Sequence, residues 1–398
     1  MKKSADVVVI GGGVIGNSIT YHLAKKGLKV ILLEKDDLAS GSSGACDIDI
    51  ILQSKNPGIH LQLAIESAKM YKPLAEELGS EIEYETCGGM ILIENDEQMN
   101  IMRDFARRQK EVGLSVKLLD LKEALEIQPG LSPHLLGATY SPDDAHVNPM
   151  KLCFAFAKAS KKLGAEIMLN APVLDIKLEK NKVRSIITPK GEIETDTVVN
   201  AAGVYAPFIG ELVGISLPIK PRRGQIVVTE PVPKLVMHDV LCAKYIVAKY
   251  NPKILEESND PATRLGVGLS LSQTHDGQIL IGATREFVGY DKRTTHEALK
   301  AVLKNATRLV PALKNIHTIR SFAGLRPYTS DGLPLLGPIE DIKGFFVAAG
   351  HEGDGIALSP VTGRIVADLI TEGKTFIDVS KLSPERFGSL KKNENEVI

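Results

Sequence analysis

Three closely spaced glycines near the start of the chain, Gly11-x-Gly13-x-x-Gly16, constrain its fold more than any other feature. The run Asp6–Ile10 before them is β-branched, as in a short strand, and Val14–Lys26 after them has apolar residues at helical spacing. The glycines therefore occupy a strand-to-helix turn, where a missing Cβ lets a ligand approach the backbone and lets the helix pack closely. Because the first N–H groups of the helix face this turn, the pattern predicts a phosphate-binding site.

An acidic residue completes this pattern. Val30–Leu33 forms a second apolar strand, and Glu34 follows it, 18 residues after Gly16. In β–α–β units of this type the acid accepts hydrogen bonds from ribose hydroxyls and disfavours a ribose 2′-phosphate. The pattern predicts binding of a dinucleotide, FAD or NAD rather than NADP. The alternative is a glycine-rich turn that binds nothing.

Two further stretches contain the small residues that a long flavin nucleotide requires. Lys35 and the segment Ser40–Gly44 offer hydroxyl and N–H groups beside the first site, or else form a surface loop. Near the C-terminus, Ala348–Ile356 carries three glycines between an expected strand and an expected helix. The positive end of that helix would stabilise the negative charge of a reduced flavin, whereas nicotinamide becomes neutral on reduction. This stretch favours FAD, with a ligand-free glycine-rich loop as the alternative.

Composition excludes several classes of protein. The 398 residues include 48 Lys+Arg and 49 Asp+Glu, a formal charge of −1, which argues against nucleic-acid binding through bulk positive charge. No uninterrupted apolar run reaches the roughly 18 residues of a transmembrane helix. The start lacks a signal-peptide cleavage pattern, so we expect a cytoplasmic protein. The four cysteines are far apart and form no C-x-x-C, so no metal site, iron–sulfur cluster or disulfide is expected.

The rest of the chain is expected to form two different layers. Strands in its middle fit a return to the first sheet, whereas the later ones have few helices between them and fit an antiparallel sheet. Asn251–Arg264 is expected to be a loop, of a length often found in lids, and Lys391–Ile398 to be frayed. The expected helices are Ile59–Glu77, Glu97–Glu111, Pro149–Leu163, Thr295–Val310 and Ala357–Ile370; the expected strands are Gly88–Ile93, Ala165–Leu169, Val173–Leu178, Val183–Thr188, Val198–Val199, Gly224–Thr229, Tyr245–Ala248, Leu265–Leu271, Gln278–Ala283 and Phe345–Ala349.

Five motifs spread along almost the whole chain belong together. They are VVVIGGGVIG with Glu34-Lys35, Asn200-Ala201-Ala202-Gly203, Pro221-Arg222-Arg223-Gly224-Gln225, Ala323-Gly324-Leu325-Arg326-Pro327-x-x-x-Asp331-Gly332-x-Pro334, and Ala349-Gly350-His351 with the glycines after it. In this combination the chain resembles the D-amino-acid oxidase superfamily of flavoproteins. The resemblance is greatest to the branch of glycine oxidase, sarcosine oxidase β-type subunits and the bacterial D-amino-acid, proline and hydroxyproline dehydrogenases. These motifs are specific to the superfamily but not to one substrate.

The resemblance implies a fold of the α/β plus α+β class, with a Rossmann-type FAD-binding domain and an antiparallel-sheet substrate domain. The FAD-binding domain is expected to be discontinuous, formed by residues 1–80, 149–222 and 320–385, and the substrate-binding domain by residues 81–148 and 223–319. FAD is expected to bind in extended form and without a covalent bond. Some relatives attach the flavin to a cysteine near the C-terminal motif or to a histidine near the N-terminus. Here no cysteine follows Cys242, and no histidine lies between the serine-rich segment Ser40–Gly44 and His60.

The resemblance also implies roles around the cofactor. Val173 corresponds by position to the residue whose backbone meets the adenine, and Ala202-Gly203 to the turn beside the pyrophosphate. Asp354 departs from the basic residue found nearby in part of the glycine oxidase branch, and His351 would contact the flavin or stabilise its own loop. The expected cofactor-binding residues are Gly11, Gly13, Val14, Ile15, Gly16, Glu34, Lys35, Ser42, Ser43, Val173, Ala202, Gly203, Gly350, Gly353, Asp354, Gly355 and Ile356.

On the substrate side the resemblance points to two residues. Arg326 corresponds to the arginine that binds the substrate carboxylate through two charge-assisted hydrogen bonds, unless it pairs with an acid such as Asp331. Tyr245 resembles a tyrosine that assists at the carboxylate, unless it faces outward from a sheet. Arg222 and Arg223 would meet the cofactor or bridge the two domains.

These roles predict an FAD-dependent oxidase or dehydrogenase acting on a CH–NH or CH–NH2 group. The substrate would be an amino or imino acid of the glycine, sarcosine, proline, hydroxyproline or D-amino-acid class, with hydride transfer from Cα to flavin N5 and no need for a side-chain base. One alternative is a glycerol-3-phosphate-type oxidase, which would need further cationic groups. Another is the flavin subunit of a heteromeric amino-acid dehydrogenase complex, and a homo-oligomer also stays open. A purely structural protein fits least, because two separate glycine-rich loops predict one ligand.

Overall fold

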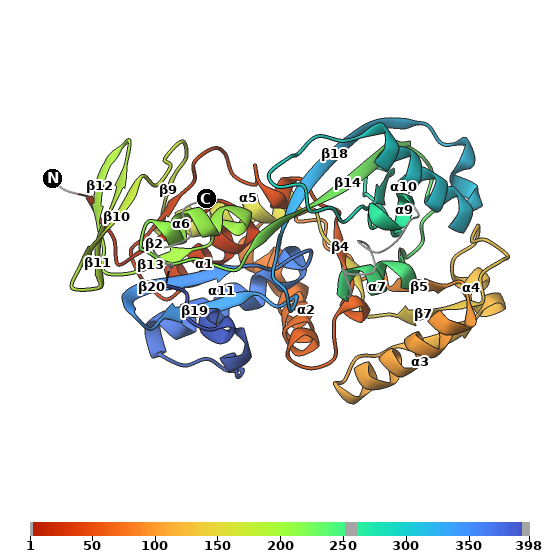
Figure 1. Cartoon of the computed structure of the whole chain (residues 1–398), viewed down its shortest axis with the longest axis horizontal. Helices are drawn as coiled ribbons and strands as arrows, with labels where there is room; N and C mark the ends of the chain where they lie inside the picture. Colours follow the sequence, from red (N-terminus) through yellow and green to blue (C-terminus); the bar gives the residue numbers. More distant parts are fainter. Residues whose placement is uncertain (1–2, 251–260, 392–398) are drawn as a thin grey trace.

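Two large β-sheets, joined by two long strands, organise the chain in the computed structural model (Figure 1). The structure describes residues 3–250 and 261–391. The first sheet has ten strands. In spatial order they are β1 (Lys3–Ser4), β12 (Gly191–Glu194), β11 (Lys182–Thr188), β20 (Ile342–Ala349), β13 (Val198–Asn200), β2 (Val7–Ile10), β3 (Val30–Leu33) and β9 (Glu166–Met168), with β10 (Asp175–Glu179) on β11 and β19 (Leu335–Ile339) on β20.

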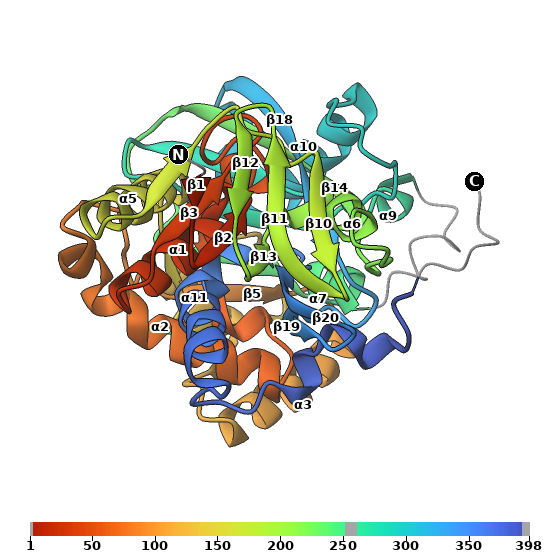
Figure 2. The same ribbon diagram turned by 90° about the vertical axis from the view of Figure 1, so that its left-hand side faces the viewer.

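The centre of this first sheet is parallel, from β20 through β13, β2 and β3 to β9. Its strands are continuous apolar runs, such as Val7–Ile10, because helices and loops bury both faces. Helices α1 (Val14–Lys25) and α11 (Gly355–Glu372) come from opposite ends of the chain and lie side by side (Figure 2). The helices of this half are α1 (Val14–Lys25), α2 (Ile59–Leu78), α5 (Pro149–Lys162), α6 (Ala206–Glu211) and α11 (Gly355–Glu372).

The second sheet has eight strands and is antiparallel except where β15 pairs with β5. Its strands in spatial order are β18 (Thr318–Tyr328), β14 (Lys220–Pro231), β17 (Gln278–Gly282), β16 (Ser270–Gln273), β15 (Asp239–Cys242), β5 (Gly89–Ile93), β7 (Gly137–Ser141) and β6 (Lys117–Asp120). A separate pair, β4 (Asp49–Ile50) and β8 (Ala145–His146), links the halves. The helices here are α3 (Asp96–Glu111), α4 (Leu121–Ile127), α7 (Ala243–Tyr250), α9 (Pro261–Arg264) and α10 (His296–Leu309).

Strands β14 and β18 run from one half of the molecule to the other (Figure 1). They pair over most of their length, and the register places Arg222 opposite Arg326 and Gly224 opposite Gly324. Two of the sequence motifs are therefore neighbours in one ladder. Short 3-10 helices complete the fold at Ser42–Gly44, Leu52–Ser54, Gly203–Tyr205, Pro311–Asn315, Ser380–Leu382 and Pro384–Phe387.

The predicted fold class is confirmed, and most expected elements agree with the structure to within a few residues. The strand expected at Tyr245–Ala248 is wrong, because β15 ends at Cys242 and the chain turns directly into α7. Aromatic and β-branched residues favour a strand locally, but tertiary packing decides here. The strand expected from Leu265 begins only at Ser270. Sequence patterns missed β18 altogether.

Two other expectations bear on ranges that the structure describes only in part. Of the expected loop Asn251–Arg264, residues 251–260 lie outside the described residues, and Pro261–Arg264 is a short helix. The expected frayed tail also lies outside them, apart from Lys391. Among the described residues, none of the helices combines the length and hydrophobicity needed to span a bilayer. The division into two domains at the stated boundaries stays a prediction; β18, which starts at Thr318, pairs within the second sheet.

Candidate active site

A cavity of about 350 Å³ is lined by residues from both sheets. At one side it meets the carboxyl ends of β2, β3 and β20, and at the other it meets β14, β15, β16 and β18. Its lining brings together all but two of the predicted site residues. These are Gly11, Gly13, Val14, Ile15, Glu34, Lys35, Ser42, Ser43, Val173, Ala202, Gly203, Tyr245, Arg326, Gly353, Asp354, Gly355 and Ile356.

The two predicted residues that do not line the cavity, Gly16 and Gly350, are packing positions. A Cβ on Gly16 would lie 1.9 Å from the carbonyl oxygen of Gly11, so only glycine lets α1 start this close to the turn. A Cβ on Gly350 would lie 2.7 Å from Cγ2 of Thr329, and Gly350 has φ +80°. Both residues shape the cavity from behind its wall.

Glu34 is held in place by the backbone of the glycine turn. Its Oε2 accepts a hydrogen bond from Gly12 N at 2.6 Å, and its Oε1 accepts one from Asp36 N at 2.8 Å. A carboxylate has about four acceptor sites, so capacity is left for two ribose hydroxyls. Val173 lines the same part of the cavity. This arrangement fits the adenosine half of a dinucleotide.

The N-termini of α1 and α11 both open toward the cavity. Neither helix has a side-chain cap or an acidic residue in its first turn, and Val14 at the start of α1 donates its N–H to Ser43 Oγ at 3.0 Å. Uncapped N–H groups and the positive ends of two helix dipoles favour anionic ligand groups. One helix start suits a pyrophosphate and the other suits a ring that becomes negative on reduction, so the residues present fit FAD.

The charge of Asp354, at the start of α11, is balanced by groups that sequence reasoning missed. Lys55 Nζ lies 2.8 Å from Asp354 Oδ1, and His60 Nε2 lies 3.1 Å from its Oδ2. All three side chains are buried. The acid therefore does not place an isolated negative charge beside the cofactor. A buried lysine close to a buried acid in three dimensions, but 299 residues away in sequence, leaves no local signal.

Arg326 projects from β18 into the cavity. Its Nη1 donates to Thr284 O at 3.0 Å, and its Nε is 4.0 Å from Glu352 Oε1. Asp331, the acid considered as its partner, instead pairs with Arg386 at 2.7 Å. The guanidinium occupies the space beside Gly224, where a Cβ would lie 2.2 Å from Nη1. The glycine of the Pro221–Gln225 motif thus makes room for the arginine of the opposite strand.

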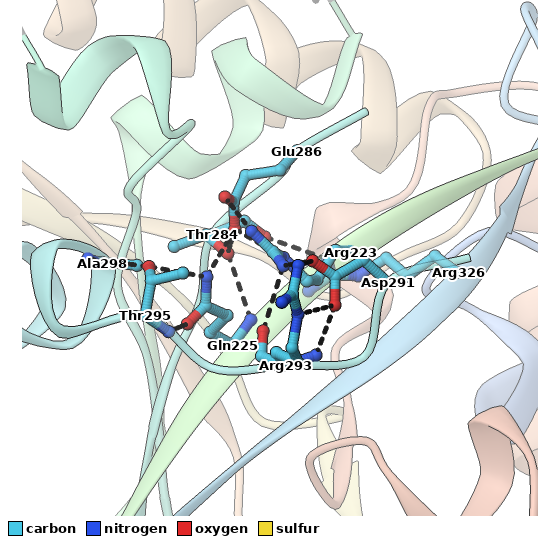
Figure 3. Close-up of polar contacts among 9 residues, drawn as sticks. All are labelled: Arg223, Gln225, Thr284, Glu286, Asp291, Arg293, Thr295, Ala298 and Arg326. Carbon is cyan, nitrogen blue, oxygen red and sulfur yellow. Dashed lines mark hydrogen bonds and ion pairs between the residues drawn. The ribbon is translucent and has the colours of Figure 1, made fainter. Parts of the chain in front are cut away.

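A polar network behind Arg326 fixes the segment that holds it (Figure 3). Arg223 pairs with Glu286 at 2.7 Å and with Asp291 at 3.1 Å. Gln225 donates to Glu286 Oε1 at 2.8 Å and accepts from Thr295 N at 2.7 Å. Thr284, whose carbonyl receives Arg326, donates its hydroxyl to the same Glu286 oxygen at 2.7 Å. Arg223 therefore connects β14 to the segment that precedes α10.

Arg222 has a different task. Its guanidinium is fully buried, pairs with Glu352 and lies 4.4 Å from the ring centre of Tyr328. Glu352 stands between β20 and α11, and Arg285 also reaches it at 2.9 Å. Arg222 on β14 and Arg285, which follows β17, thus converge on one acid of the loop that starts α11. Of the two arginines considered from the sequence, Arg222 therefore links the two halves of the molecule, and Arg223 does not.

Tyr245 is buried and lines the cavity from helix α7, so it does not face outward from a sheet. The guanidinium of Arg285 lies 4.1 Å from its ring centre. Burial raises the pKa of its hydroxyl, so Tyr245 is neutral and able to donate a hydrogen bond.

Two acids that sequence reasoning did not select line the same part of the cavity. Ser270 Oγ lies 2.8 Å from Asp49 Oδ2 and 3.2 Å from Asp47 Oδ2, so one hydroxyl spans both carboxylates. Burial raises the pKa of each carboxyl, and the proximity of Asp47 raises that of Asp49 further. The pair is poised to accept hydrogen bonds from a cationic or amine group. The sequence feature that could have identified these two acids is their Asp-x-Asp spacing shortly after the serine-rich segment.

His351 is buried beside the cavity, and its Nε2 lies 3.2 Å from Thr362 Oγ1. Burial lowers the pKa of His351 to about 3, so the ring is neutral at physiological pH. Asp354 and His60 are the titratable groups whose charges act on it. The ring thus packs its loop, and its contact with the cofactor stays a prediction.

We expect this histidine to make the folded state sensitive to acid. Its pKa is about 3 in the folded chain and about 6.5 when unfolded, so the unfolded chain binds the proton more readily between these values. Stability is present above pH 6.5 and is lost as pH falls, by about 2–3 kcal/mol for this group at pH 4.5. Denaturant unfolding of wild type and His351→Gln, each at pH 4.5 and at a pH above 6.5, measures this loss of stability. Equal losses in the two proteins would contradict the assignment.

Comparison with known proteins shows which family the chain belongs to. The family model described as FAD dependent oxidoreductase matches residues 6–369. The chain belongs to this family. It is 33% identical to glycine oxidase of Geobacillus kaustophilus over 97% of this chain and 98% of the relative. It is 27% identical to hydrogen cyanide synthase subunit HcnC of Pseudomonas aeruginosa, with 97% of each chain covered. The solved L-proline dehydrogenase of P. horikoshii superposes with a TM-score of 0.88 at 31% identity, covering 97% and 98% of the two chains.

Membership of the FAD-dependent oxidoreductase family confirms the predicted cofactor and reaction type. The residues expected to hold FAD by position are those that the cavity gathers from the two ends of the chain. Their individual roles toward the cofactor stay predictions, as does a non-covalent attachment.

Proposed function

We propose that this FAD-dependent oxidoreductase oxidises a small amino or imino acid whose carboxylate is bound by Arg326. The observation that carries the proposal is a guanidinium that lines the cavity and whose nearest acidic group, on Glu352, is 4.0 Å away. A guanidinium in this position matches the planar, bidentate geometry of a carboxylate. The names of the similar proteins, glycine oxidase and L-proline dehydrogenase, support the same substrate class.

The other polar groups of the cavity suit the amine of such a substrate. Asp47 and Asp49 offer carboxyl oxygens, and Tyr245 offers a neutral hydroxyl. An arginine on one side and acids on the other orient a molecule that carries a carboxylate and an amine. Such orientation lowers the activation barrier by several kcal/mol. When bound, FAD supplies the electron-accepting ring that takes a hydride from the substrate Cα. No further side-chain base is needed for this step.

A glycerol-3-phosphate-type oxidase is less consistent with the cationic groups of the cavity. Those that line it are Lys35, Lys55, Lys292 and Arg326. Lys55 is paired with Asp354, and Lys35 and Lys292 lie over the ring of Tyr205, at 5.1 and 5.9 Å from its centre. Among the described residues this leaves Arg326 as the cation beside Asp47 and Asp49. A phosphate of charge near −2 would meet one cation and two acids there.

Assembly and location stay proposals. The relative named as a hydrogen cyanide synthase subunit supports the idea that this chain can serve as the flavin subunit of a heteromeric complex. A homo-oligomer and a cytoplasmic location are the other predictions we retain.

The test is anaerobic reduction of the bound flavin. Glycine, sarcosine, proline, hydroxyproline and D-amino acids are each mixed with the FAD-loaded protein, and loss of flavin absorbance is followed. We expect at least one to reduce the flavin, and glycerol 3-phosphate not to. Reduction by glycerol 3-phosphate alone would overturn the proposal in favour of the 2-hydroxy alternative.

The acid pair provides a second prediction. Asp49→Asn replaces one carboxyl oxygen by an amide NH2 group, which cannot accept a hydrogen bond from the substrate amine, and hydrogen bonds to charged groups contribute about 1.5–3 kcal/mol. We therefore expect KM for the amino acid to rise roughly 10- to 100-fold while FAD content stays unchanged. Steady-state kinetics across pH measures this, and Asp276→Asn, at an exposed acid between β16 and β17, is the matched control. An unchanged KM would remove Asp49 from the substrate site.

A further inference from the structure

Three side chains outside the cavity bring a sulfur, a nitrogen and an oxygen atom together. Cys87 Sγ lies 3.4 Å from His146 Nδ1 and 3.6 Å from Asp239 Oδ2, and these last two atoms are 3.5 Å apart. None of the three residues lines the cavity. They stand up to 152 residues apart in the chain. Sequence spacing therefore gave no sign of them, and the expectation of no metal site rested on spacing alone.

We propose that Cys87, His146 and Asp239 bind a zinc ion. Zinc bonds of about 2.3 Å to sulfur, 2.0–2.1 Å to nitrogen and 2.0–2.2 Å to oxygen, arranged tetrahedrally, place the ligand atoms about 3.3–3.6 Å from one another. The three observed separations match these values without movement of any side chain. A mixed thiolate, imidazole and carboxylate set favours zinc over magnesium or calcium, which prefer oxygen ligands.

Hydrogen-bond chemistry supports a cation at this point. His146 Nε2 lies 3.5 Å from Glu85 Oε2. With the ring proton on Nε2, facing this acid, Nδ1 would present a lone pair toward the thiol sulfur and toward a carboxylate oxygen. The single S–H proton can bridge only one pair of these atoms, whereas a divalent cation binds all three. The Glu85–His146 contact is the second-sphere arrangement that metal-binding histidines generally have.

The backbone holds the three ligands in fixed positions. Glu85 and His146 exchange two backbone hydrogen bonds of 3.0 Å each. Asp239 N donates to Gly88 O at 3.2 Å, and β15 pairs with β5 from Asp239 opposite Gly89. Three separate segments are thus locked in register beside Cys87. A site on paired strands is preorganised, so little conformational entropy is lost on binding.

The burial of Asp239 gives a further reason for a cation. Its side chain is 2% exposed. Among the ion pairs of the described residues, none joins Asp239 to a lysine or arginine. Buried carboxylates are normally paired or coordinate metals. Zinc binding would displace the thiol proton of Cys87 to solvent, forming an S–Zn bond with no change of oxidation state.

The test uses cobalt(II) as a spectroscopic probe of the FAD-loaded protein after treatment with a chelator. We expect one equivalent of CoCl2 to produce the intense absorption band of tetrahedral cobalt(II) in the red region of the spectrum, at longer wavelength than the flavin bands. ZnCl2 should remove this band. Cys87→Ser and His146→Gln should abolish this absorption, and Glu85→Gln should weaken binding roughly tenfold. His275→Gln, a change at an exposed histidine paired with Asp276, is the matched control and should leave it intact.

A second measurement avoids any dependence on how the variants fold. In the wild-type protein, alkylation of partly exposed Cys87 by iodoacetamide, read by mass spectrometry, should slow at least tenfold when ZnCl2 is present, while MgCl2 should leave its rate unchanged. The competing arrangement is an imidazolium between Glu85 and Asp239 with no metal. Absence of the cobalt absorption, its persistence in Cys87→Ser, or equal alkylation with and without zinc would each overturn the zinc site.

Discussion

Arg326→Ala is expected to lower kcat/KM for the amino-acid substrate by about 30- to 5,000-fold, with unchanged FAD content. The reason is the loss of a charge-assisted pair at a side chain that is 13% exposed, where removing one partner costs about 2–5 kcal/mol. The cofactor should be retained, because the residues expected to bind FAD come from segments of the chain other than β18. Arg326→Lys keeps the charge but not the planar fork, so it should recover only part of the activity. Stopped-flow reduction of the flavin and steady-state kinetics measure both quantities.

Gly224→Ala is the matched test of the same idea from the opposite strand. The added Cβ would fall 2.2 Å from Arg326 Nη1 and 2.6 Å from its Cζ. Because the obstructed atoms are the end of a flexible side chain, the strand can keep its place while the guanidinium moves away. We expect KM to rise at least tenfold, roughly the effect of a misplaced binding group. If Arg326→Ala and Gly224→Ala both leave kcat/KM intact, Arg326 does not bind the substrate.

The second large effect is expected for Gly16→Ala, which should yield protein largely free of FAD. The new Cβ would lie 1.9 Å from the carbonyl oxygen of Gly11, a backbone atom that cannot swing aside. Helix α1 must therefore move away from the turn, and with it the N–H groups at its start. A displacement of about 1 Å is enough to cost roughly 100-fold in a positioned interaction. Alanine is the better helix former by about 1 kcal/mol, so helix propensity predicts the opposite sign.

Gly27→Ala, just beyond the other end of the same helix, is the control. Gly27 has φ +83°, and a Cβ there would meet no atom within 4 Å. The substitution costs about 1 kcal/mol of backbone strain but leaves the turn at Gly11 untouched. The ratio of flavin to protein absorbance after purification, and FAD titration of the stripped protein, compare the two variants. Equal FAD binding by Gly16→Ala and wild type would show that the glycine turn does not position the cofactor.

Much of the nucleotide half could be predicted from sequence because its signals are local. The strand Val30–Leu33 has the predicted bounds, and α1 ends one residue before the predicted Lys26. A buried parallel strand needs a continuous apolar run, and a helix needs apolar residues at regular spacing. Each segment can therefore be recognised from its own residues. The glycine turn is equally local. Its three glycines and Glu34 lie within one β–α–β unit, and all but Gly16 line the cavity.

The second half was harder to predict, and for a physical reason. Tyr245–Ala248 has strand-forming residues, but β15 ends at Cys242 and the chain turns into α7, from which Tyr245 lines the cavity. β18 has a mixed burial pattern, since it runs past both halves and meets different neighbours along its length. β-propensity reports fit to a particular surface, and that surface is set by the partner strands.

The sequence by itself determined the class of fold and the family, because the glycine turns, the apolar strands and the motifs are each contained in short segments. Only the tertiary structure decided how the charges are arranged. It placed Lys55 against Asp354, left Arg326 4.0 Å from Glu352 beside Asp47 and Asp49, and gathered Cys87, His146 and Asp239. The reason is that the partners of a buried charge are chosen by distance in space, and β-sheet pairing brings together residues whose separation in the chain carries no pattern.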